Sequence, residues 1–296
     1  MTHALVLIAA KNALDVHHVK TAREAAVAAG ARAGVPHWLS DGEACDIPFE
    51  GAIDAVRAAA RDALLGEPLD VNVVAVDGRR KRLLVADMDS TIIGCECIDE
   101  IADAAGIKPQ VAAITERAMR GELVFEDALR ERVALLKGLP QDQLATVYEK
   151  RVRLNPGAKA LVQTMRKDGA LTALVSGGFT YFTGRVAAET GFDIVQANEL
   201  HIAGGKLLGT VAEPILGREA KRALLVRLAR ERSIPLGATL AVGDGANDLD
   251  MIRASGLGVA YHAKPVVAAA AAARIDHGDL RALLFLQGYA AAEIAG

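Results

Sequence analysis

The amino-acid sequence predicts an α/β protein: a doubly wound parallel sheet with an inserted helical cap, preceded by a small α+β domain. Three short apolar runs that each end in polar residues indicate the sheet, namely Leu83–Ala86, Leu171–Val175 and Thr239–Val242. Parallel strands that are covered by helices on both faces have such continuous apolar sequences. The patterns before residue 79 and between residues 97 and 153 differ from this one and indicate the other two parts.

The composition is that of a globular protein with more than one domain. A chain of 296 residues, 52% of them hydrophobic, is long enough to bury a sizeable core. The net charge of −3 gives no reason to expect nucleic acid or an anionic membrane as a partner. The three cysteines, Cys45, Cys95 and Cys97, match neither a disulfide framework nor a zinc site. With no secretory signal and no apolar stretch of ~20 residues, we expect a cytoplasmic protein without membrane partners.

Residues 1–78 are expected to form the small α+β domain. Their predicted elements alternate between strands and helices, which suits a sheet covered by helices. In order, these elements are Ala4–Ile8, Val19–Ala29, strands around Trp38 and Ala44–Phe49, Ile53–Leu65 and Val71–Val76. No cluster of polar residues in this part indicates chemistry.

Residues 79–96 and 154–296 are expected to form the core that contains the parallel sheet. Asn155 and Pro156 are typical of the N-cap and first turn of a helix, and Gly169 is typical of its end. Further core elements are expected at Gly217–Glu231, at Ala246–Ala254 and, as a fourth strand, at Gly258–Ala260.

Residues 97–153 are expected to form the helical cap. Consecutive helical segments interrupt the alternation of strands and helices directly after the first strand. They are Ile98–Ala105, Pro109–Met119, Phe125–Leu136 and Gln141–Lys150. An insertion at this point lies above the carboxyl ends of the strands, where such sheets bind ligands, so we expect it to act as a lid.

Two carboxylates, Asp87 and Asp89, follow the first predicted strand. A carboxylate can attack phosphorus and form an acyl phosphate. A second carboxylate can protonate the departing alkoxide and later deprotonate water. The pair therefore predicts Asp87 as the nucleophile and Asp89 as the general acid and base, with Mg²⁺ and a lysine supplying positive charge.

The other two strand tips carry the groups that such chemistry needs. Ser176 and the backbone N–H of Gly177 can hold phosphate oxygens, and Lys221 can neutralise the phosphate. Asp244 and Asp248 offer oxygen ligands of the type that Mg²⁺ prefers. Each of these motifs alone is more often a turn, a helix cap or a solvated lysine. Their occurrence together at strand tips that face one crevice favours a phosphate-handling site.

These motifs resemble those of the haloacid dehalogenase (HAD) superfamily and follow the family's order. They are Asp87-Met-Asp-Ser-Thr91, Ser176-Gly, Lys221 and Gly243-Asp-Gly-Ala-Asn-Asp248. With its second Asp, the first motif resembles that of the phosphatase branch of the family. P-type ATPases carry Thr at this position, and dehalogenases lack that carboxylate. The resemblance implies a Rossmann-like core and Mg²⁺ held by Asp87, the Asp89 carbonyl and Asp244. It also implies a phosphate site made by Ser176, Gly177 and Lys221 and completed by Asn247 and Asp248.

Within the phosphatases, the chain resembles bacterial phosphoserine phosphatases over essentially its whole length. This implies hydrolysis of L-phosphoserine, the last step of serine biosynthesis, through a phosphoaspartyl intermediate. Glu96 would bind the substrate ammonium and Arg132 its carboxylate, beside Met119 and Phe125. Phe125 and Arg132 are seven residues apart and so share a helix face. Without the resemblance, Glu96 and Arg132 are typical surface or ion-pair residues.

Two other functions stay open at this point. A HAD phosphatase or phosphotransferase for another small phosphomonoester would keep the same fold. A phospho-acceptor signalling domain also places an Asp at a strand tip, but it needs neither Asp89 nor a lid that carries Glu96 and Arg132. Residues 1–78 resemble an ACT-like domain, which leaves ligand sensing and packing or homodimer formation as alternative roles.

Overall fold

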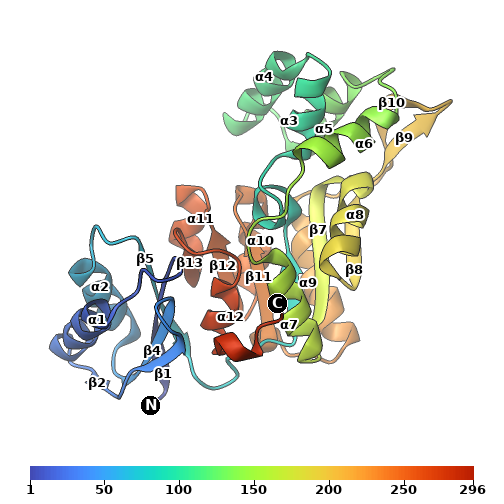
Figure 1. Ribbon diagram of the computed structural model, residues 1–296. Helices are drawn as coiled ribbons and strands as arrows, with labels where there is room; N and C mark the ends of the chain where they lie inside the picture. The colour runs from blue at the N-terminus through green and yellow to red at the C-terminus, as the bar shows by residue number, and fades with distance from the viewer.

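The computed structural model describes residues 1–296 and confirms the predicted fold class. Figure 1 shows the large sheet in the middle, the helices of the cap above one of its ends, and a second sheet near the N-terminus. None of the helices combines the length and the apolar character that crossing a lipid bilayer requires.

The first sheet is antiparallel and has the strand order β2-β4-β1-β5, with β3 paired to β4. Its strands are β1 (His3–Ala9), β2 (Arg32–Ala33), β3 (His37–Ser40), β4 (Ala44–Glu50) and β5 (Leu69–Ala75). Helices α1 (Val16–Ala28) and α2 (Ile53–Ala63) cover one face, where Leu5 and Leu7 join their core. Val6 and Ile8 point to the opposite face and belong to the core of the large sheet. Both faces of β1 are therefore buried, which explains its continuous apolar sequence.

The large sheet is parallel throughout, with the strand order β13-β12-β11-β6-β7-β8. Its strands are β6 (Leu83–Ala86), β7 (Leu171–Phe179), β8 (Ile194–Asn198), β11 (Thr239–Gly243), β12 (Leu257–Tyr261) and β13 (Ala273–Ile275). The chain runs outward from β6 through β7 and β8 and then returns to the other side of β6 as β11. The topological switch point, where open α/β sheets bind ligands, thus lies between β6 and β11.

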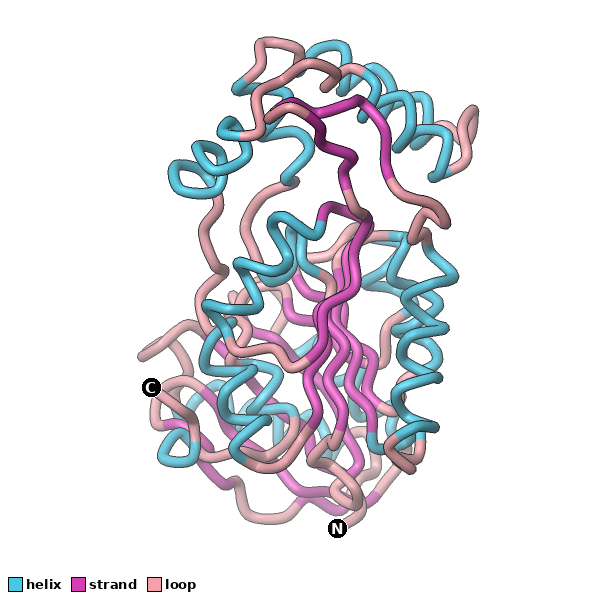
Figure 2. Tube along the Cα trace, turned by 90° about the vertical axis from the view of Figure 1, so that its right-hand side faces the viewer, coloured by secondary structure: helices cyan, strands magenta, loops and turns pink.

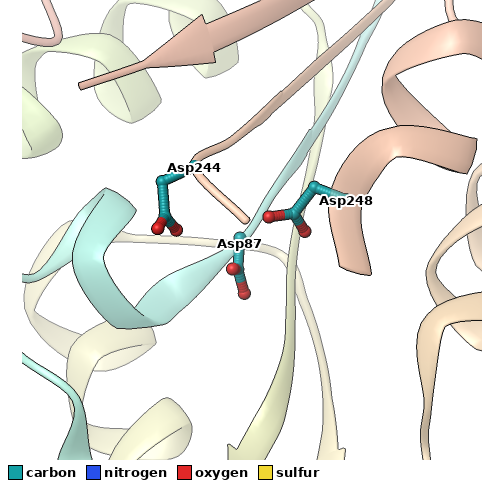
Figure 3. A group of neighbouring side chains, drawn as sticks. All are labelled: Asp87, Asp244 and Asp248. Carbon is teal, nitrogen blue, oxygen red and sulfur yellow. The ribbon is translucent and has the colours of Figure 1, made fainter. Parts of the chain in front are cut away.

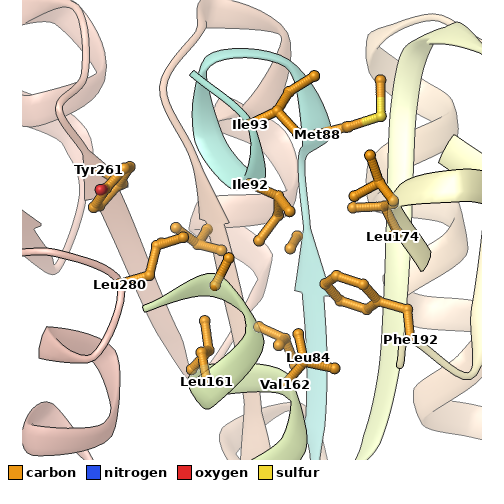
Figure 4. Packing of buried hydrophobic residues seen from close by; sticks show 14 of the residues in the cluster. Leu84, Met88, Ile92, Ile93, Leu161, Val162, Leu174, Phe192, Tyr261 and Leu280 are labelled. Atoms are coloured by element: carbon orange, nitrogen blue, oxygen red, sulfur yellow. The ribbon is translucent and has the colours of Figure 1, made fainter. Parts of the chain in front are cut away.

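Helices cover both faces of this sheet. They are α7 (Ala158–Lys167), α8 (Thr180–Thr190), α9 (Arg218–Glu231), α10 (Leu249–Ala254), α11 (Pro265–Ala270) and α12 (Ala282–Leu286). Val85 of β6 packs with α9 and α10, whereas Leu84 packs with α7 on the other face. Figure 4 shows Leu84 beside Val162 and Phe192, below the turn that carries Ile92. The turn after β6 therefore rests on a packed core.

The cap contains α3 (Cys97–Ala104), α4 (Lys108–Met119), α5 (Phe125–Ala134) and α6 (Asp142–Arg151). Figure 2 shows these helices beyond one end of the strands of the large sheet. A hairpin of β9 (Leu200–Ala203) and β10 (Lys206–Val211), which the sequence did not predict, packs against α5. The predicted division gives this hairpin to the core, and its contacts favour counting it with the cap.

The predicted N-cap at Asn155 is wrong. Helix α7 begins after Gly157, which has a φ of 81° and is its N-cap residue. The Asn155 side chain instead donates a hydrogen bond to the Thr91 carbonyl oxygen over 2.8 Å. A tertiary contact to the first motif thus replaces the local capping bond that the sequence favours.

Arg79 joins the N-terminal unit to the core. Its guanidinium forms a bidentate pair with Asp46, in which Nη2 lies 2.8 Å from Oδ1. Its Nε and Nη2 also donate to the carbonyl oxygens of Leu286 and Phe285, over 2.7 and 2.9 Å. Both members of the ion pair are nearly buried. The residue therefore connects β4, the linker and the end of α12.

We expect Arg79→Gln to destabilise the fold by about 3–5 kcal/mol, because it leaves Asp46 buried without its partner. Urea unfolding followed by circular dichroism measures this change. Arg32→Gln is the control, since its long contact to Glu50 is exposed and its loss should leave the midpoint essentially unchanged. Equal midpoints for the two variants would contradict a structural role for the Arg79 pair.

Candidate active site

Three carboxylates meet at the switch point of the large sheet. Asp87 follows β6, Asp244 follows β11, and Asp248 ends the short helical turn η3 (Ala246–Asp248). Oxygen atoms of the three side chains all lie within 4.8 Å of one another. Figure 3 shows Asp244 and Asp248 on either side of Asp87. The sheet topology thus brings together residues that are up to 161 positions apart, from Asp87 to Asp248.

Lys221 of α9 binds two of these carboxylates. Its Nζ lies 2.6 Å from Asp87 Oδ1 and 2.7 Å from Asp248 Oδ1, and only 1% of the residue is exposed. Asp248 Oδ2 accepts the Gly245 N–H over 3.0 Å. A Cβ atom on Gly243 would lie 2.3 Å from the Asp248 carboxyl carbon, so this position requires glycine. Asp248 therefore holds Lys221, and Lys221 lies against Asp87.

Burial and charge determine the ionisation of this cluster. Burial and repulsion from Asp248 raise the pKa of Asp87 well above its usual value, although Lys221 opposes them. Burial lowers the pKa of Lys221, but attraction to Asp248 and Asp87 outweighs it and raises that pKa. Burial, followed by repulsion from Asp248, also raises the pKa of Asp244. Three carboxylates beside one ammonium group leave negative charge that suits a divalent cation with oxygen ligands.

Asp89 lies between the core and the entrance of the cap. Its Oδ1 accepts the Cys97 N–H at the start of α3, over 2.9 Å, and its Oδ2 accepts the Ser176 hydroxyl over 2.9 Å. The turn between β6 and α3 bends sharply at Ser90, which has a positive φ of 56°. Both oxygens of Asp89 are thus oriented by fixed donors from different elements.

The last part of β7 contains Ser176, Gly177 and Gly178, and groups from the turn after β6 and from the cap lie close to its backbone. The Ser176 Oγ accepts the Gly178 N–H over 2.8 Å while it donates to Asp89. A Cβ atom on Gly178 would lie 2.8 Å from Asp89 Oδ2, and one on Gly177 would lie 2.8 Å from the Phe125 ring. Side chains at either glycine would therefore displace Asp89 or the cap.

The predicted cap residues differ in how they are placed. The Phe125 ring lies against Gly177, and the Ser90 hydroxyl donates to Glu96 Oε1 over 2.7 Å. Although part of Glu96 is exposed, burial and repulsion from Asp89 raise its pKa to about 7. Met119 ends α4 with 73% of the residue exposed, so packing gives no support for its predicted role in binding.

Arg132 is the unpaired arginine on helices α4 and α5. Arg117, Arg130 and Arg120, which caps the end of α4, each form ion pairs with acidic residues. Arg132 is half-buried and donates its Nε to the Ala128 carbonyl oxygen over 3.2 Å, with no carboxylate within 4.0 Å. Burial lowers its pKa, while Asp99 and Glu96 attract its charge. Its terminal N–H groups are therefore available to a ligand.

Two supporting residues were not predicted from the sequence. Asn198, at the end of β8, donates to the Gly177 carbonyl oxygen over 2.8 Å and accepts the Leu216 N–H over 2.7 Å. Thr91, whose carbonyl oxygen accepts from Asn155, donates its hydroxyl to Asp244 over 3.3 Å. Asn247, which was predicted, lies with its side-chain oxygen over Gly245. Both the burial of Asn198 and its place at the end of β8 are known only from the structure, so no local signal in the sequence identified it.

Comparison with known proteins finds one hydrolase family and, within it, phosphoserine phosphatases. Residues 84–253 match the family model of the haloacid dehalogenase-like hydrolases. A phosphoserine phosphatase from Polaromonas sp. (strain JS666) is 47% identical over 225 residues, which cover 74% of this chain and 95% of that protein. One from Streptomyces coelicolor is 44% identical over 80% of this chain, which spans only 57% of that longer protein.

Solved structures extend the likeness over the whole chain. A probable phosphoserine phosphatase from Vibrio cholerae, in unliganded form, is 33% identical, with a TM-score of 0.78 over 99% of this chain and 88% of that one. A structure described as the phospho-aspartyl intermediate analogue of phosphoserine phosphatase is 39% identical. It has a TM-score of 0.65 over 70% of this chain and 98% of that one.

The contact of Lys221 with Asp87 leads to a prediction about how the stability of the fold depends on pH. Lys221→Met removes the attraction that lowers the pKa of Asp87, so that pKa rises further in the folded state. A carboxyl group with a raised folded pKa binds more protons when folded, so its contribution to stability falls as pH rises above the unfolded pKa. We expect a loss of about 3–5 kcal/mol at about pH 8 and a smaller loss at about pH 5.

Urea unfolding of the cation-free chain in EDTA measures this difference. Lys20→Met, at an exposed site on α1, is the control and should show no such dependence on pH. An equal loss of stability at both pH values for Lys221→Met would contradict the electrostatic account.

Proposed function

This chain belongs to the haloacid dehalogenase-like hydrolase family, and from this premise we propose that it hydrolyses L-phosphoserine to L-serine and phosphate through a phosphoaspartyl intermediate. Such a reaction completes serine biosynthesis. The observation that carries the proposal is the placement of Asp87 and Asp89. One carboxylate is paired with a buried lysine and the other is bound by Ser176, below a cap with an unpaired arginine.

In the first step, a carboxylate oxygen of Asp87 attacks phosphorus while the bond from phosphorus to the serine oxygen breaks. Asp89 donates its proton to the departing serine oxygen. Asp89 then takes a proton from water, which attacks phosphorus and releases phosphate from Asp87. The contacts of Asp89 with Ser176 and the Cys97 N–H support this role, because they fix both of its oxygens at the entrance of the cap.

The phosphate group needs a cationic environment. We assign Ser176, the Gly177 N–H, Lys221 and Asn247 to phosphate binding, with Asp248 supporting Lys221. The acidic cluster fits a divalent cation, which we propose to be Mg²⁺ held by Asp87, the Asp89 carbonyl oxygen and Asp244. When bound, such a cation offsets the repulsion between Asp87 and the phosphate.

The cap selects the substrate in this proposal. The free terminal N–H groups of Arg132 suit bidentate binding of the substrate carboxylate. Glu96 suits the substrate ammonium, whose charge favours the ionised form of a carboxyl group with a pKa of about 7. We assign Phe125, which already touches Gly177, and Met119 to the walls around the head group.

Arg132→Ala tests this assignment. The loss of a charge-assisted pair in a closed site should reduce kcat/KM for phosphoserine by roughly 30- to 1,000-fold, mainly through KM. Phosphoethanolamine lacks the carboxylate, so it should be a poor substrate for the parent and lose little further. Arg120→Ala is the control, because Arg120 pairs with Glu116 and Glu122 on the surface of the cap. Equal losses of kcat/KM for both substrates would show that Arg132 does not bind the substrate carboxylate.

Asp89→Asn tests the acid. We expect turnover of phosphoserine to fall by roughly 10²- to 10⁴-fold, because an amide cannot protonate the serine oxygen. An aryl phosphate with an acidic leaving group needs no proton in this step, so its loss should be smaller. Steady-state rates and burst amplitudes for both substrates give the comparison. An equal loss of turnover for phosphoserine and the aryl phosphate would mean that Asp89 acts only in the second step or has only a structural role.

A further inference from the structure

Asp70 of β5 binds a loop of the large domain from the N-terminal unit. The residue is 2% exposed, and its carboxylate accepts the backbone N–H groups of Asp276, His277 and Gly278 over 2.7, 3.1 and 2.8 Å. Three N–H groups that converge on one buried carboxylate fix the conformation of a loop. Asp70 therefore determines the path of residues 276–278.

Asn72 forms a second polar contact at the same edge. Its side-chain amide donates to the Arg274 carbonyl oxygen over 2.8 Å and accepts the Arg274 N–H over 2.9 Å. The side chain thus pairs with β13 as a neighbouring strand would. The end of β13 and the loop after it are therefore both held by β5.

The loop at residues 276–278 is bonded in turn to the segment after β12. His262 Nε2 lies 2.9 Å from the Gly278 carbonyl oxygen, and it is the donor because a carbonyl oxygen only accepts. The His262 N–H donates to the Ile275 carbonyl oxygen over 2.8 Å. His262 has a positive φ of 44°, and these two bonds hold this unfavourable conformation.

The segment after β12 reaches the active site. The Lys264 N–H donates to the Asp244 carbonyl oxygen over 3.1 Å. The side chain of Asp244 belongs to the carboxylate cluster and accepts from Thr91. Hydrogen bonds therefore link Asp70 to Gly278 and Gly278 to the His262 side chain. The chain then continues over two residues from His262 to Lys264, whose N–H bonds the backbone of Asp244.

We propose that Asp70 is a positioning residue for the cation site, and that the N-terminal unit sets the affinity of this site through the loop at residues 276–278, His262 and Asp244. The inference rests on the proposed role of Asp244 as a cation ligand. Groups that orient a metal ligand directly change metal affinity by about 10- to 100-fold. Asp70 acts over several bonds, so we expect a smaller effect of about three- to tenfold.

A purely structural role for Asp70 makes a different prediction. In that case its loss would lower stability as the loss of other docking contacts does, with no change in cation affinity. Arg79 is the matched reference, because it joins the same two parts through Asp46, Phe285 and Leu286 and has no bond to residues 276–278.

The experiment measures Mn²⁺ binding to the full chain without substrate, by electron paramagnetic resonance of the free ion. We expect Asp70→Asn to bind Mn²⁺ about three- to tenfold more weakly than the parent, and Arg79→Gln to bind it as the parent does despite its lower stability. Parent-like affinity for Asp70→Asn, or equal weakening in both variants, would overturn the proposal. If the parent bound no Mn²⁺, the cation site of the proposed function would itself be wrong. If the parent bound Mn²⁺ and Asp70→Asn bound it equally well, only the role of Asp70 would be wrong.

His262→Ala tests the middle of this connection and keeps the proposal testable if Asp70→Asn folds poorly, because His262 is at the surface. We expect it to weaken Mn²⁺ binding by a similar factor. Because both changes break the same connection, the double variant should bind about as weakly as either single variant. Effects that multiply in the double variant, or parent-like affinity for His262→Ala, would show that Asp70 and Asp244 are not connected through this loop.

Discussion

The position of a buried ammonium group between two carboxylates is the constraint on which the rest of the site depends. Lys221 is within 2.7 Å of both Asp87 and Asp248, and all three side chains are shielded from water. Asp87 without Lys221 would be driven toward its neutral form by burial, and a neutral carboxyl group is a poor nucleophile. Lys221 without the two carboxylates would be an uncompensated buried charge. The reactivity of Asp87 and the stability of the strand tip therefore depend on one interaction.

The fold satisfies this constraint through its topology. Because β11 lies beside β6, the turns that carry Asp87 and Asp244 leave adjacent strands in the same direction. Helix α9 brings Lys221 from a third segment, and the cap reaches the same point through the contact of Phe125 with Gly177. The antiparallel sheet of the N-terminal unit adds its own face to the main core, with Val6 and Ile8 packed in the same cluster as Leu84. The unit is thus part of the support of the catalytic sheet.

Sequence reasoning was most successful where one physical signal was local. Apolar runs that end in polar residues predicted β6, β7 and β11 and placed Asp87 directly after β6. It failed where a residue acts over a long distance in the chain. Asn155 has the sequence signature of a helix cap, yet its amide binds Thr91, and nothing near Asn198 or Asp70 indicates the loops that they hold. The hairpin of β9 and β10 was missed although its signal is local, because Gly204 and Gly205 form its two-residue turn with positive φ.

The most direct test of the account is to trap the phosphorylated enzyme. The parent chain would be mixed with radiolabelled phosphoserine, quenched in acid during turnover and digested, and the labelled peptide would be identified by mass spectrometry. The account predicts an acid-stable, hydroxylamine-sensitive label on Asp87, and its absence in Asp87→Asn. Turnover by the parent with no labelled aspartate, or with the label on another residue, would contradict the account. Undiminished turnover by Asp87→Asn would contradict it as well.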